Sequence, residues 1–327
     1  MAMMTVIEAV REAMREEMQR DASVFVLGED VGRRGGVFLA TQGFIDEFGE
    51  ERVIDTPLAE AAIAGVAVGA AMSGMRPIAE VQFGDFVFPV FNQIVGEAAR
   101  IRYGTKGKIS VPMVLRIPYG GHIRGGLFHS QSPEAYFAHT PGLQVLCPAT
   151  PYDAKGLLKA AIRSNDPVVF LEHKRTYRAV RGEVPDGDYV VPIGVADIKR
   201  YGDAATIITY GLTMHYSLQA AEVLAAEGIE IEVIDLRTVS PIDRDTVLES
   251  VRKTNRVLVV HEDNIALGVG AEVSALIAEH AFGNLDAPVM RVAGPDIPAM
   301  PFAPTLEAAY MPTADKIEAG LRRLLEY

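Results

Sequence analysis

The stretch DTPLAEAAIAGVAVGAAMSGMRPIAEVQF, residues 55–83, carries the pattern that decides the fold. Between Leu58 and Met75 it holds a single charge, Glu60, and is otherwise rich in Ala and Gly, which predicts a packed helix. Pro77–Phe83 is a short apolar run typical of a buried strand. A helix followed directly by a strand indicates a parallel sheet covered by helices, which is an α/β fold.

The same alternation continues on both sides of this stretch. Val- and Ile-rich runs predict strands, and longer segments of helical character lie between them. The strands are expected at residues 24–27, 111–117, 143–147 and 168–171, and the helices near the N-terminus and at 85–103 and 152–163. We therefore predict a first α/β domain over residues 1–180.

A second series of elements follows a break in the pattern. RGEVPDGDYVVPIG, residues 181–194, combines turn residues with charges and predicts a linker over 181–198. Strands are then expected at 205–210, 229–236 and 256–261, with helices at 214–227 and 243–253. Residues 199–327 are thus predicted to form a smaller α/β domain.

Composition narrows the class of protein. The net charge of −12 over 327 residues argues against nucleic acid or an anionic membrane as the partner. The longest uncharged run, 61–75, is shorter than the ~20 residues that a membrane crossing needs. Cys147 is the only cysteine, so an intramolecular disulfide is impossible. With no recognisable targeting segment, we expect a protein of the reducing cytoplasm, with no nucleic acid and no membrane among its partners.

Glu60 is the first candidate for chemistry. Ala61, Gly65 and Gly69 recur every four residues, a spacing that lets another backbone approach closely. We expect the helix to be buried, with a contact between subunits as one way to bury it. Glu60 is then desolvated, its pKa rises and it can donate a hydrogen bond. A first-turn glutamate stabilised by the helix dipole is the alternative.

His129 is the second candidate, in GLFHSQSPEA, residues 126–135, directly after GGHIRGG. A histidine among glycines and hydroxyls can be presented for catalysis by a loop, although a solvated side chain explains the same residues. The other histidines lack the spacing of a metal site; they are His122, His139, His173, His215, His261 and His280. Phe86 follows a predicted strand end, where ligands bind in α/β sheets, but core packing is its alternative.

Several long motifs occur together in the chain. They are VLGEDVGRRGGVF (26–38), RVIDTPLAEAAIAGVAVGAAMSGMRPIAE (52–80), FHSQSPEAYFAHTPGL (128–143), TPYDAKGLLKAAIRSNDPVVFLEHK (150–174) and DLRTVSPID (235–243). With these motifs, the whole chain resembles the beta subunit of the thiamine diphosphate-dependent decarboxylating component of 2-oxo acid dehydrogenase complexes. The resemblance implies a pyrimidine-binding α/β domain followed by a smaller domain like the C-terminal domain of transketolase.

The resemblance assigns roles to the candidate residues. The residue matching Glu60 hydrogen-bonds the pyrimidine ring of thiamine diphosphate and promotes its imino tautomer, and the one matching Phe86 lies against the aminopyrimidine. Glu29 matches an acidic residue near the cofactor. His129 matches a histidine of a mobile loop that assists acyl transfer to the lipoyl arm. An imidazole that titrates near neutrality suits the proton delivery that this transfer needs.

The resemblance also implies partners, because the chain lacks part of a cofactor site. The GDG motif that opens the diphosphate and magnesium site in this superfamily is absent, and DGD at 186–188 is reversed. A separate alpha subunit should therefore hold Mg²⁺ and the diphosphate, in a heterotetramer of two alpha and two beta chains. A lipoyl-bearing dihydrolipoyl acyltransferase would dock on the C-terminal domain.

A structural potassium ion (K⁺) is a further implication of the resemblance. Many members hold this ion mainly by backbone carbonyls, and the matching positions are Met113, Ala161, Ile162, Ser164 and Asp166. The family's usual Asp and Asn are replaced here by Ser164 and Asp166. A helix end with ordinary turn residues is the alternative.

The substrate is predicted from one motif. HSQSPEAYFAH, residues 129–139, is more similar to branched-chain members than to pyruvate members, so a branched-chain 2-oxo acid is expected before pyruvate, and acetoin comes third. Two other classes stay open: a non-catalytic assembly subunit, and a stand-alone transketolase-like enzyme that binds the cofactor without a partner.

Overall fold

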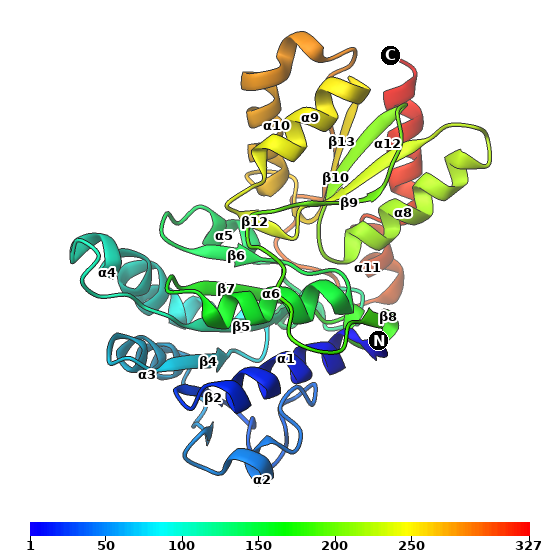
Figure 1. Ribbon diagram of the computed structural model, residues 1–327. Helices are drawn as coiled ribbons and strands as arrows, with labels where there is room; N and C mark the ends of the chain where they lie inside the picture. Colours follow the sequence, from blue (N-terminus) through cyan, green and yellow to red (C-terminus); the bar gives the residue numbers. More distant parts are fainter. The chain divides into compact units, whose positions relative to one another are not determined.

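The computed structural model describes residues 1–327 and contains two compact units, shown in Figure 1. The first unit consists of residues 1–119 and 136–193, and the second of residues 120–135 and 194–327. The chain therefore leaves the first unit at residue 120, returns to it at residue 136, and leaves it again at residue 194.

The first unit is built on a parallel sheet, as predicted. Its strands lie in the order β6-β7-β5-β4-β2-β3, and each neighbouring pair is parallel. They are β2 (Val24–Gly28), β3 (Val53–Asp55), β4 (Arg76–Glu80), β5 (Val114–Tyr119), β6 (Gln144–Leu146) and β7 (Val168–His173). All residues of β2, β5 and β7 are buried, as in a sheet covered on both faces.

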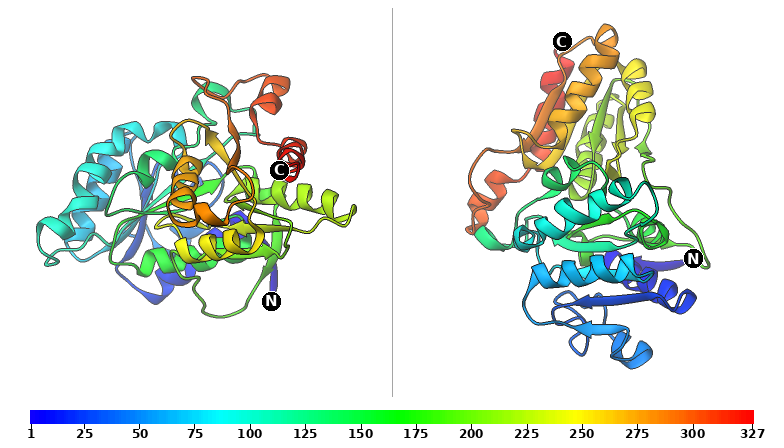
Figure 2. Two further views of the ribbon diagram at one scale, coloured as in Figure 1. Left: turned by 90° about the horizontal axis from the view of Figure 1, so that it is seen from above. Right: turned by 90° about the vertical axis from the view of Figure 1, so that its left-hand side faces the viewer.

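Helices cover this sheet, as the views in Figure 2 show. They are α1 (Val6–Arg20), α2 (Phe44–Phe48), α3 (Glu60–Met72), α4 (Ala99–Gly104), α5 (Glu134–Ala138), α6 (Pro151–Arg163) and α7 (Thr176–Ala179). Thr5 caps α1 in a capping box with Glu8, which satisfies backbone donors at the helix start. Met14 and Leu157 belong to the core that α1 and α6 share with the sheet.

Residues 85–103 do not form the single helix that we predicted. Short 3-10 turns at Gly84–Phe86 and Phe88–Val90 lead into a π-helix, Asn92–Ala98, and only then into α4. Pro89 lacks the backbone N–H that a continuous helix would use, which explains the interruption.

The segment expected as a linker begins with a strand. β8 (Arg181–Val184) pairs antiparallel with β1 (Ala2–Thr5), so the extreme N-terminus is extended before α1 begins. Periodicity within one segment does not reveal this pairing, because the two short strands are far apart in the sequence.

The second unit contains a mostly parallel sheet in the order β14-β13-β10-β11-β9, in which only β9 is antiparallel to its neighbour. Its strands are β9 (Asp197–Arg200), β10 (Ala205–Thr209), β11 (Ile231–Asp235), β13 (Val257–Asn264) and β14 (Met290–Gly294), and β12 (Thr238–Ser240) follows β11. Its helices are α8 (Leu212–Ala225), α9 (Arg244–Thr254), α10 (Val269–Ala281), α11 (Pro304–Tyr310) and α12 (Ala314–Leu325). Ile207, Leu258 and Leu321 are fully buried in its core.

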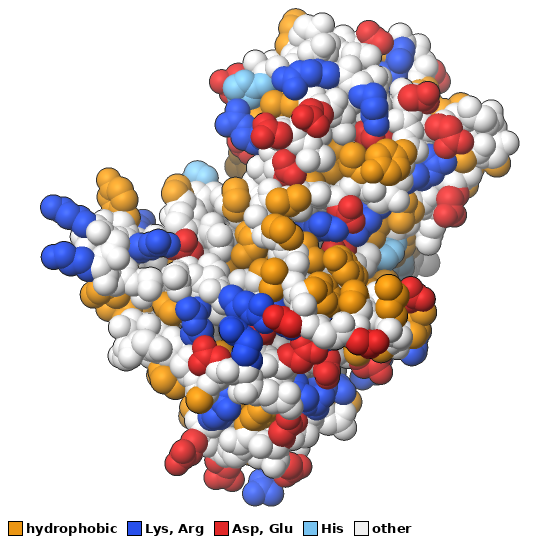
Figure 3. Space-filling model, in the orientation of Figure 1, with side chains coloured by type: hydrophobic (Ala, Val, Ile, Leu, Met, Phe, Trp, Pro, Cys, Tyr) orange, Lys and Arg blue, Asp and Glu red, His pale blue; other side chains and the backbone are white.

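The surface carries charges of both signs. On the face drawn in Figure 3, acidic and basic side chains are interspersed, and a group of Lys and Arg side chains projects around α4. No helix is long and apolar enough to cross a membrane.

Candidate active site

The carboxyl edge of the first sheet collects three of the predicted site residues. Glu29 directly follows β2, Glu60 is the first residue of α3 after β3, and Phe86 lies in the turn after β4. Because β2, β3 and β4 are parallel neighbours, their carboxyl ends share one edge of the sheet. Ligands bind at this edge in open α/β sheets.

Two carboxyl groups interact at this edge. Glu29 is 9% exposed, and its Oε1 is buried with no hydrogen-bond partner in the chain. Burial raises the pKa of Glu29, and the negative charge of Glu60 raises it further. In this chain the side chain of Glu60 is half-buried, and the desolvation expected for it between subunits stays a prediction.

The loop after β2 is held by Asp55 at the end of β3. The backbone N–H of Gly32 donates to Asp55 Oδ1 over 2.6 Å. A Cβ at Gly32 would lie 2.4 Å from Asp55 Oδ2, so only glycine fits this close approach. Glu29 is therefore fixed between β2 and a loop whose position the neighbouring strand sets.

Phe86 lies at the end of a chain of ring contacts. Its ring meets the Phe83 ring edge-on at 5.5 Å between centroids, and Phe83 meets Phe38 at 5.6 Å. Lys174 Nζ lies 5.4 Å from the centroid of the Phe83 ring. These contacts support Phe86 from one side, while its own side chain stays half-buried.

Helix α3 is buried on one face in this chain and exposed on another. Ile63, Ala64 and Ala67 are buried, but Val66 on another face is 56% exposed. A Cβ at Gly69 would meet nothing within 4 Å. Gly69 therefore serves no close packing within the chain, whereas a Cβ at Gly65 would lie 3.6 Å from Gln93 Cγ.

A buried ion network crosses the middle of the same sheet, and the sequence analysis missed it. Arg116 of β5 donates to both carboxylate oxygens of Glu172 at 2.6 Å and to Glu80 Oε2 at 2.5 Å. The hydroxyl of Tyr177 donates to Glu172 Oε2 at 2.6 Å. The charged groups are at most 3% exposed. The sequence feature that could have revealed this network is Arg116, a charged residue within an otherwise apolar strand segment.

The pKa values in this network follow from burial and from the neighbouring charges. Burial opposes the positive charge of Arg116, but Glu172 and Glu80 outweigh it, and the pKa of Arg116 is raised. Burial raises the pKa of Glu80 despite the Arg116 charge, and burial next to Glu172 raises that of Tyr177. The network is thus a buried polar element within the same sheet whose carboxyl edge carries the candidate site.

His129 lies in the segment 120–135, which belongs to the second unit. Its side chain is half-buried, and a 3-10 turn at Gly126–Phe128 precedes it. A Cβ at Gly125 would lie 2.7 Å from both the His129 carbonyl oxygen and Ser130 Oγ. This glycine is therefore required by close contact inside the loop.

Two other histidines, His122 and His261, lie next to groups that account for them without a catalytic role. His122 Nδ1 lies 2.6 Å from the hydroxyl of Tyr216. Burial, assisted by the positive charge of Arg291, lowers the pKa of His261 to about 4, so this ring is neutral near pH 7. The structure contains no group of three or more His, Cys, Asp and Glu side chains that could hold a metal ion.

The residues matched to a potassium site lie around the end of α6. Arg76 Nη1 donates to the carbonyl oxygens of Ile162 at 2.9 Å and Ser164 at 2.8 Å. The side chain of Asp166 accepts from Arg102 Nη1 at 2.5 Å. Two of the expected carbonyl ligands thus already contact a cationic side chain, and the potassium ion stays a prediction from the resemblance.

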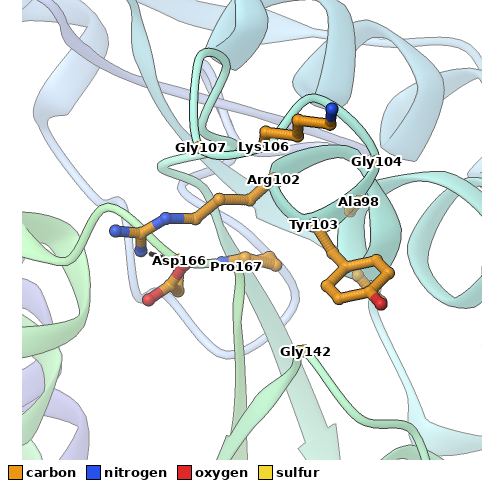
Figure 4. A pocket seen from close by; sticks show the side chains of 10 residues that line it. Ala98, Arg102, Tyr103, Gly104, Lys106, Gly107, Gly142, Asp166 and Pro167 are labelled. Carbon is orange, nitrogen blue, oxygen red and sulfur yellow. Dashed lines mark hydrogen bonds and ion pairs between the residues drawn. The ribbon is translucent and has the colours of Figure 1, made fainter.

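An open cavity of about 800 Å³ adjoins α4 (Figure 4). Arg102, Tyr103 and Lys106 line it, with Asp166 and Pro167 across from them. Apart from Asp166, none of the predicted site residues lines this cavity. It is therefore separate from the candidate site at the carboxyl edge.

Comparisons with known proteins agree with this arrangement. Residues 2–180 match the transketolase pyrimidine-binding domain, and residues 194–317 match the transketolase C-terminal domain. The chain is 59% identical to 2-oxoisovalerate dehydrogenase subunit beta of Bacillus subtilis (strain 168), and 48% identical to pyruvate dehydrogenase E1 component subunit beta of the same strain, over 100% of each chain. A solved structure, "Split gene transketolase, inactive beta4 tetramer", is similar with a TM-score of 0.81 and 25% identity, covering 99% of this chain and 98% of that one. The chain therefore belongs to the family of 2-oxo acid dehydrogenase beta subunits.

Proposed function

We propose that the chain is the beta subunit of a branched-chain 2-oxo acid dehydrogenase, which decarboxylates the acid oxidatively and acylates lipoyl groups. The observation that carries this proposal is the electrostatic interaction of Glu29 with Glu60 at the carboxyl edge of a pyrimidine-binding domain, the edge that the turn with Phe86 also follows. The higher identity to the 2-oxoisovalerate enzyme, 59% against 48% for the pyruvate enzyme, favours the branched-chain acid. Pyruvate and then acetoin are the alternatives.

The residues at the edge fit the pyrimidine half of thiamine diphosphate. The cofactor supplies a nucleophilic thiazolium carbon and accepts the electrons that the departing carboxyl group leaves behind. Glu60, at the start of α3 and half-buried, would hydrogen-bond the pyrimidine ring. The buried Oε1 of Glu29 has no partner in the chain, and the raised pKa of this group favours a proton shared with its neighbour. Phe86 would contact the ring of the pyrimidine.

His129 is proposed to act in the second half of the reaction. When a lipoyl disulfide opens, one sulfur receives the acyl group and the other must receive a proton. A half-buried imidazole on a loop can deliver that proton near neutral pH. The lipoyl group belongs to a dihydrolipoyl acyltransferase, which is the second proposed partner.

We propose an alpha subunit as the first partner, in a heterotetramer of two alpha and two beta chains. The alpha subunit would hold Mg²⁺ and the diphosphate, for which this chain offers neither a GDG motif nor a cluster of acidic ligands. The exposed face of α3, with Val66 and Gly69, supports contact with another subunit. Working with such a complex, the chain would act in the cytoplasm.

Calorimetry with thiamine diphosphate and Mg²⁺ tests the shared site. We expect no binding by this chain alone and binding by its mixture with the alpha subunit. Binding by this chain alone would instead support a stand-alone transketolase-like enzyme. If Glu60→Gln and His129→Ala both left turnover of the mixture unchanged, the chain would be a non-catalytic assembly subunit.

Two finer assignments are also proposals. We propose that the domains span residues 1–180 and 199–327 with a connection at 181–198, although β8 within it pairs with β1. The potassium ion is tested by thermal unfolding in KCl and in NaCl at equal ionic strength. A midpoint raised by K⁺ alone would support the ion, and equal midpoints would leave Arg76 as the cation at these carbonyls.

A further inference from the structure

The segment that carries His129 is a loop whose two ends meet. The backbone N–H of Gly120 donates to the carbonyl oxygen of Gln131 over 3.1 Å. The residues between them form a compact surface loop, residues 121–132, which we call the histidine loop. Loops of this kind keep their shape through contacts of their own side chains and of the neighbouring elements.

Glu262, on β13, holds both ends of the histidine loop. Its Oε1 accepts the backbone N–H of Gly121 at 2.6 Å and the hydroxyl of Ser132 at 3.2 Å. The Glu262 side chain is only 3% exposed, and its contact to Gly121 is buried, while that to Ser132 is partly buried. Removal of the Glu262 side chain would leave the Gly121 N–H, a buried donor, without its acceptor.

Glu307, on α11, holds the middle of the same loop. Its Oε1 accepts the backbone N–H of Arg124 at 3.0 Å, and its side chain is 2% exposed. The loop therefore meets two buried carboxyl groups from separate elements of the second unit, β13 and α11, both labelled in Figure 1.

Two glycines bring the histidine loop against the segment that leads into α11. A Cβ at Gly121 would lie 2.0 Å from Met300 Sδ, and one at Gly126 would lie 2.8 Å from Phe302 Cδ2. These contacts place the backbone of the loop directly on its neighbours. The glycines of GGHIRGG thus serve fixed close contacts.

The backbone of the histidine loop is also strained. His122 and Arg124 have φ values of 62° and 60°, in the left-handed region that side chains other than glycine rarely adopt. Such conformations are unfavourable and persist only where the surroundings enforce them. The Glu307 contact to the Arg124 N–H lies at one of these two residues.

We infer that Glu262 and Glu307 are positioning residues that fix the histidine loop, and with it His129, for acyl transfer to a lipoyl group. This inference rests on the proposed function of His129. Neither carboxylate needs to touch the substrate, because each acts through backbone donors of the loop. Displacement of a catalytic group by about 1 Å can lower a rate about 10²-fold.

The test compares Glu262→Ala and Glu262→Gln in the complex reconstituted with the alpha subunit, thiamine diphosphate and Mg²⁺. Acylation of a lipoyl domain and reduction of an artificial dye are measured separately. We expect Glu262→Ala to lower lipoyl acylation about 10²-fold and dye reduction by a much smaller factor. Glu262→Gln should recover most of the acylation, because its amide oxygen can still accept from Gly121. Glu222→Ala, at an exposed glutamate of α8, is the matched control.

Trypsin cleavage after the exposed Arg124 reports on the loop independently of catalysis. We expect faster cleavage in Glu262→Ala and Glu307→Ala than in the unaltered chain and the control. Should Glu262→Ala fail to fold, Ser132→Ala removes one of the same contacts from the loop side. Unchanged cleavage in folded variants would overturn the inference. A different result would be faster cleavage in these variants with lipoyl acylation unchanged both in them and in His129→Ala. That result would support the anchoring of the loop by Glu262 and Glu307, but it would overturn the proposed role of His129.

Discussion

At the scale of single residues, two glutamates at the carboxyl edge of the first sheet differ in how deeply they are buried. Glu29 is buried with an unpartnered oxygen, while Glu60 is half-buried at the start of α3. We predicted a site role for both residues, and the desolvation expected for Glu60 at a contact between subunits stays a prediction. Glu29 directly follows β2 and is 9% exposed, and the loop after it is held by Asp55 at the end of β3.

Replacement of Glu60 by Gln tests its proposed role. The amide keeps the shape of the side chain but cannot share a proton with the pyrimidine, so turnover of the complex should fall about 10²–10⁴-fold. Dye reduction by the reconstituted complex measures it. Glu51→Gln, the same change at an exposed residue, is the control and should leave turnover unchanged. Full activity of the Glu60 variant would contradict the assignment.

Arg116 provides a test of stability. Arg116→Met leaves Glu80 and Glu172 buried without their cation, and the free energy of unfolding should fall by about 3–5 kcal/mol. Urea unfolding of the full chain measures this loss. Arg34→Met breaks only the exposed pair with Asp30 and should cost about 0–1 kcal/mol. Equal losses of unfolding free energy in the two variants would mean that the buried network contributes no more to stability than an exposed ion pair.

Asp263 makes stability depend on pH. Burial, with the charge of Glu262 beside it, raises the pKa of Asp263 from 3.8 to about 7. The folded chain then holds a proton that the unfolded chain has lost, so this contribution to stability is full below about pH 4 and is lost as pH rises through 7. Asparagine does not titrate, so the Asp263→Asn chain should not lose this contribution. Its thermal unfolding midpoint, compared with that of the unaltered chain, should therefore rise from about pH 5 to pH 8. A difference that stays constant with pH would contradict it.

At the scale of elements, the strands and helices of the predicted alternation are found where hydrophobic periodicity is strong. β2, β7, α6 and α9 lie within a few residues of their predicted positions. The misses have specific physical causes. Pro89 interrupts the expected helix at 85–103, and β1 and β8 form only because distant segments pair. α12 is amphipathic, but no expectation was drawn for it.

Helix α3 supports a prediction about assembly. Gly69→Leu should leave the isolated chain folded, because nothing lies within 4 Å of a Cβ there and leucine favours the helix by up to about 1 kcal/mol. The larger side chain should nevertheless prevent close contact with another subunit. Thermal unfolding and sedimentation with the alpha subunit measure the two effects. Ala278→Leu, on an exposed position of α10, should leave both unchanged, and normal assembly of the Gly69 variant would contradict a subunit contact at α3.

At the scale of the whole molecule, the main feature that the sequence did not predict is the assignment of residues 120–135 to the second unit. The loop follows β5 directly in the chain, yet its anchors are Glu262 and Glu307, well over a hundred residues later. Long-range contacts between a loop and buried carboxylates leave no periodic pattern in the sequence. Resemblance to a family could select His129, but only the structure identifies the groups that hold its loop.

The central claim is that this chain acts on a branched-chain 2-oxo acid together with an alpha subunit. The most direct measurement is dye reduction by the reconstituted pair with thiamine diphosphate and Mg²⁺, with 3-methyl-2-oxobutanoate compared to pyruvate. We predict no activity from either chain alone, and a higher kcat/KM of the pair for 3-methyl-2-oxobutanoate. A higher kcat/KM for pyruvate would contradict the substrate, and turnover by this chain alone would contradict the shared site.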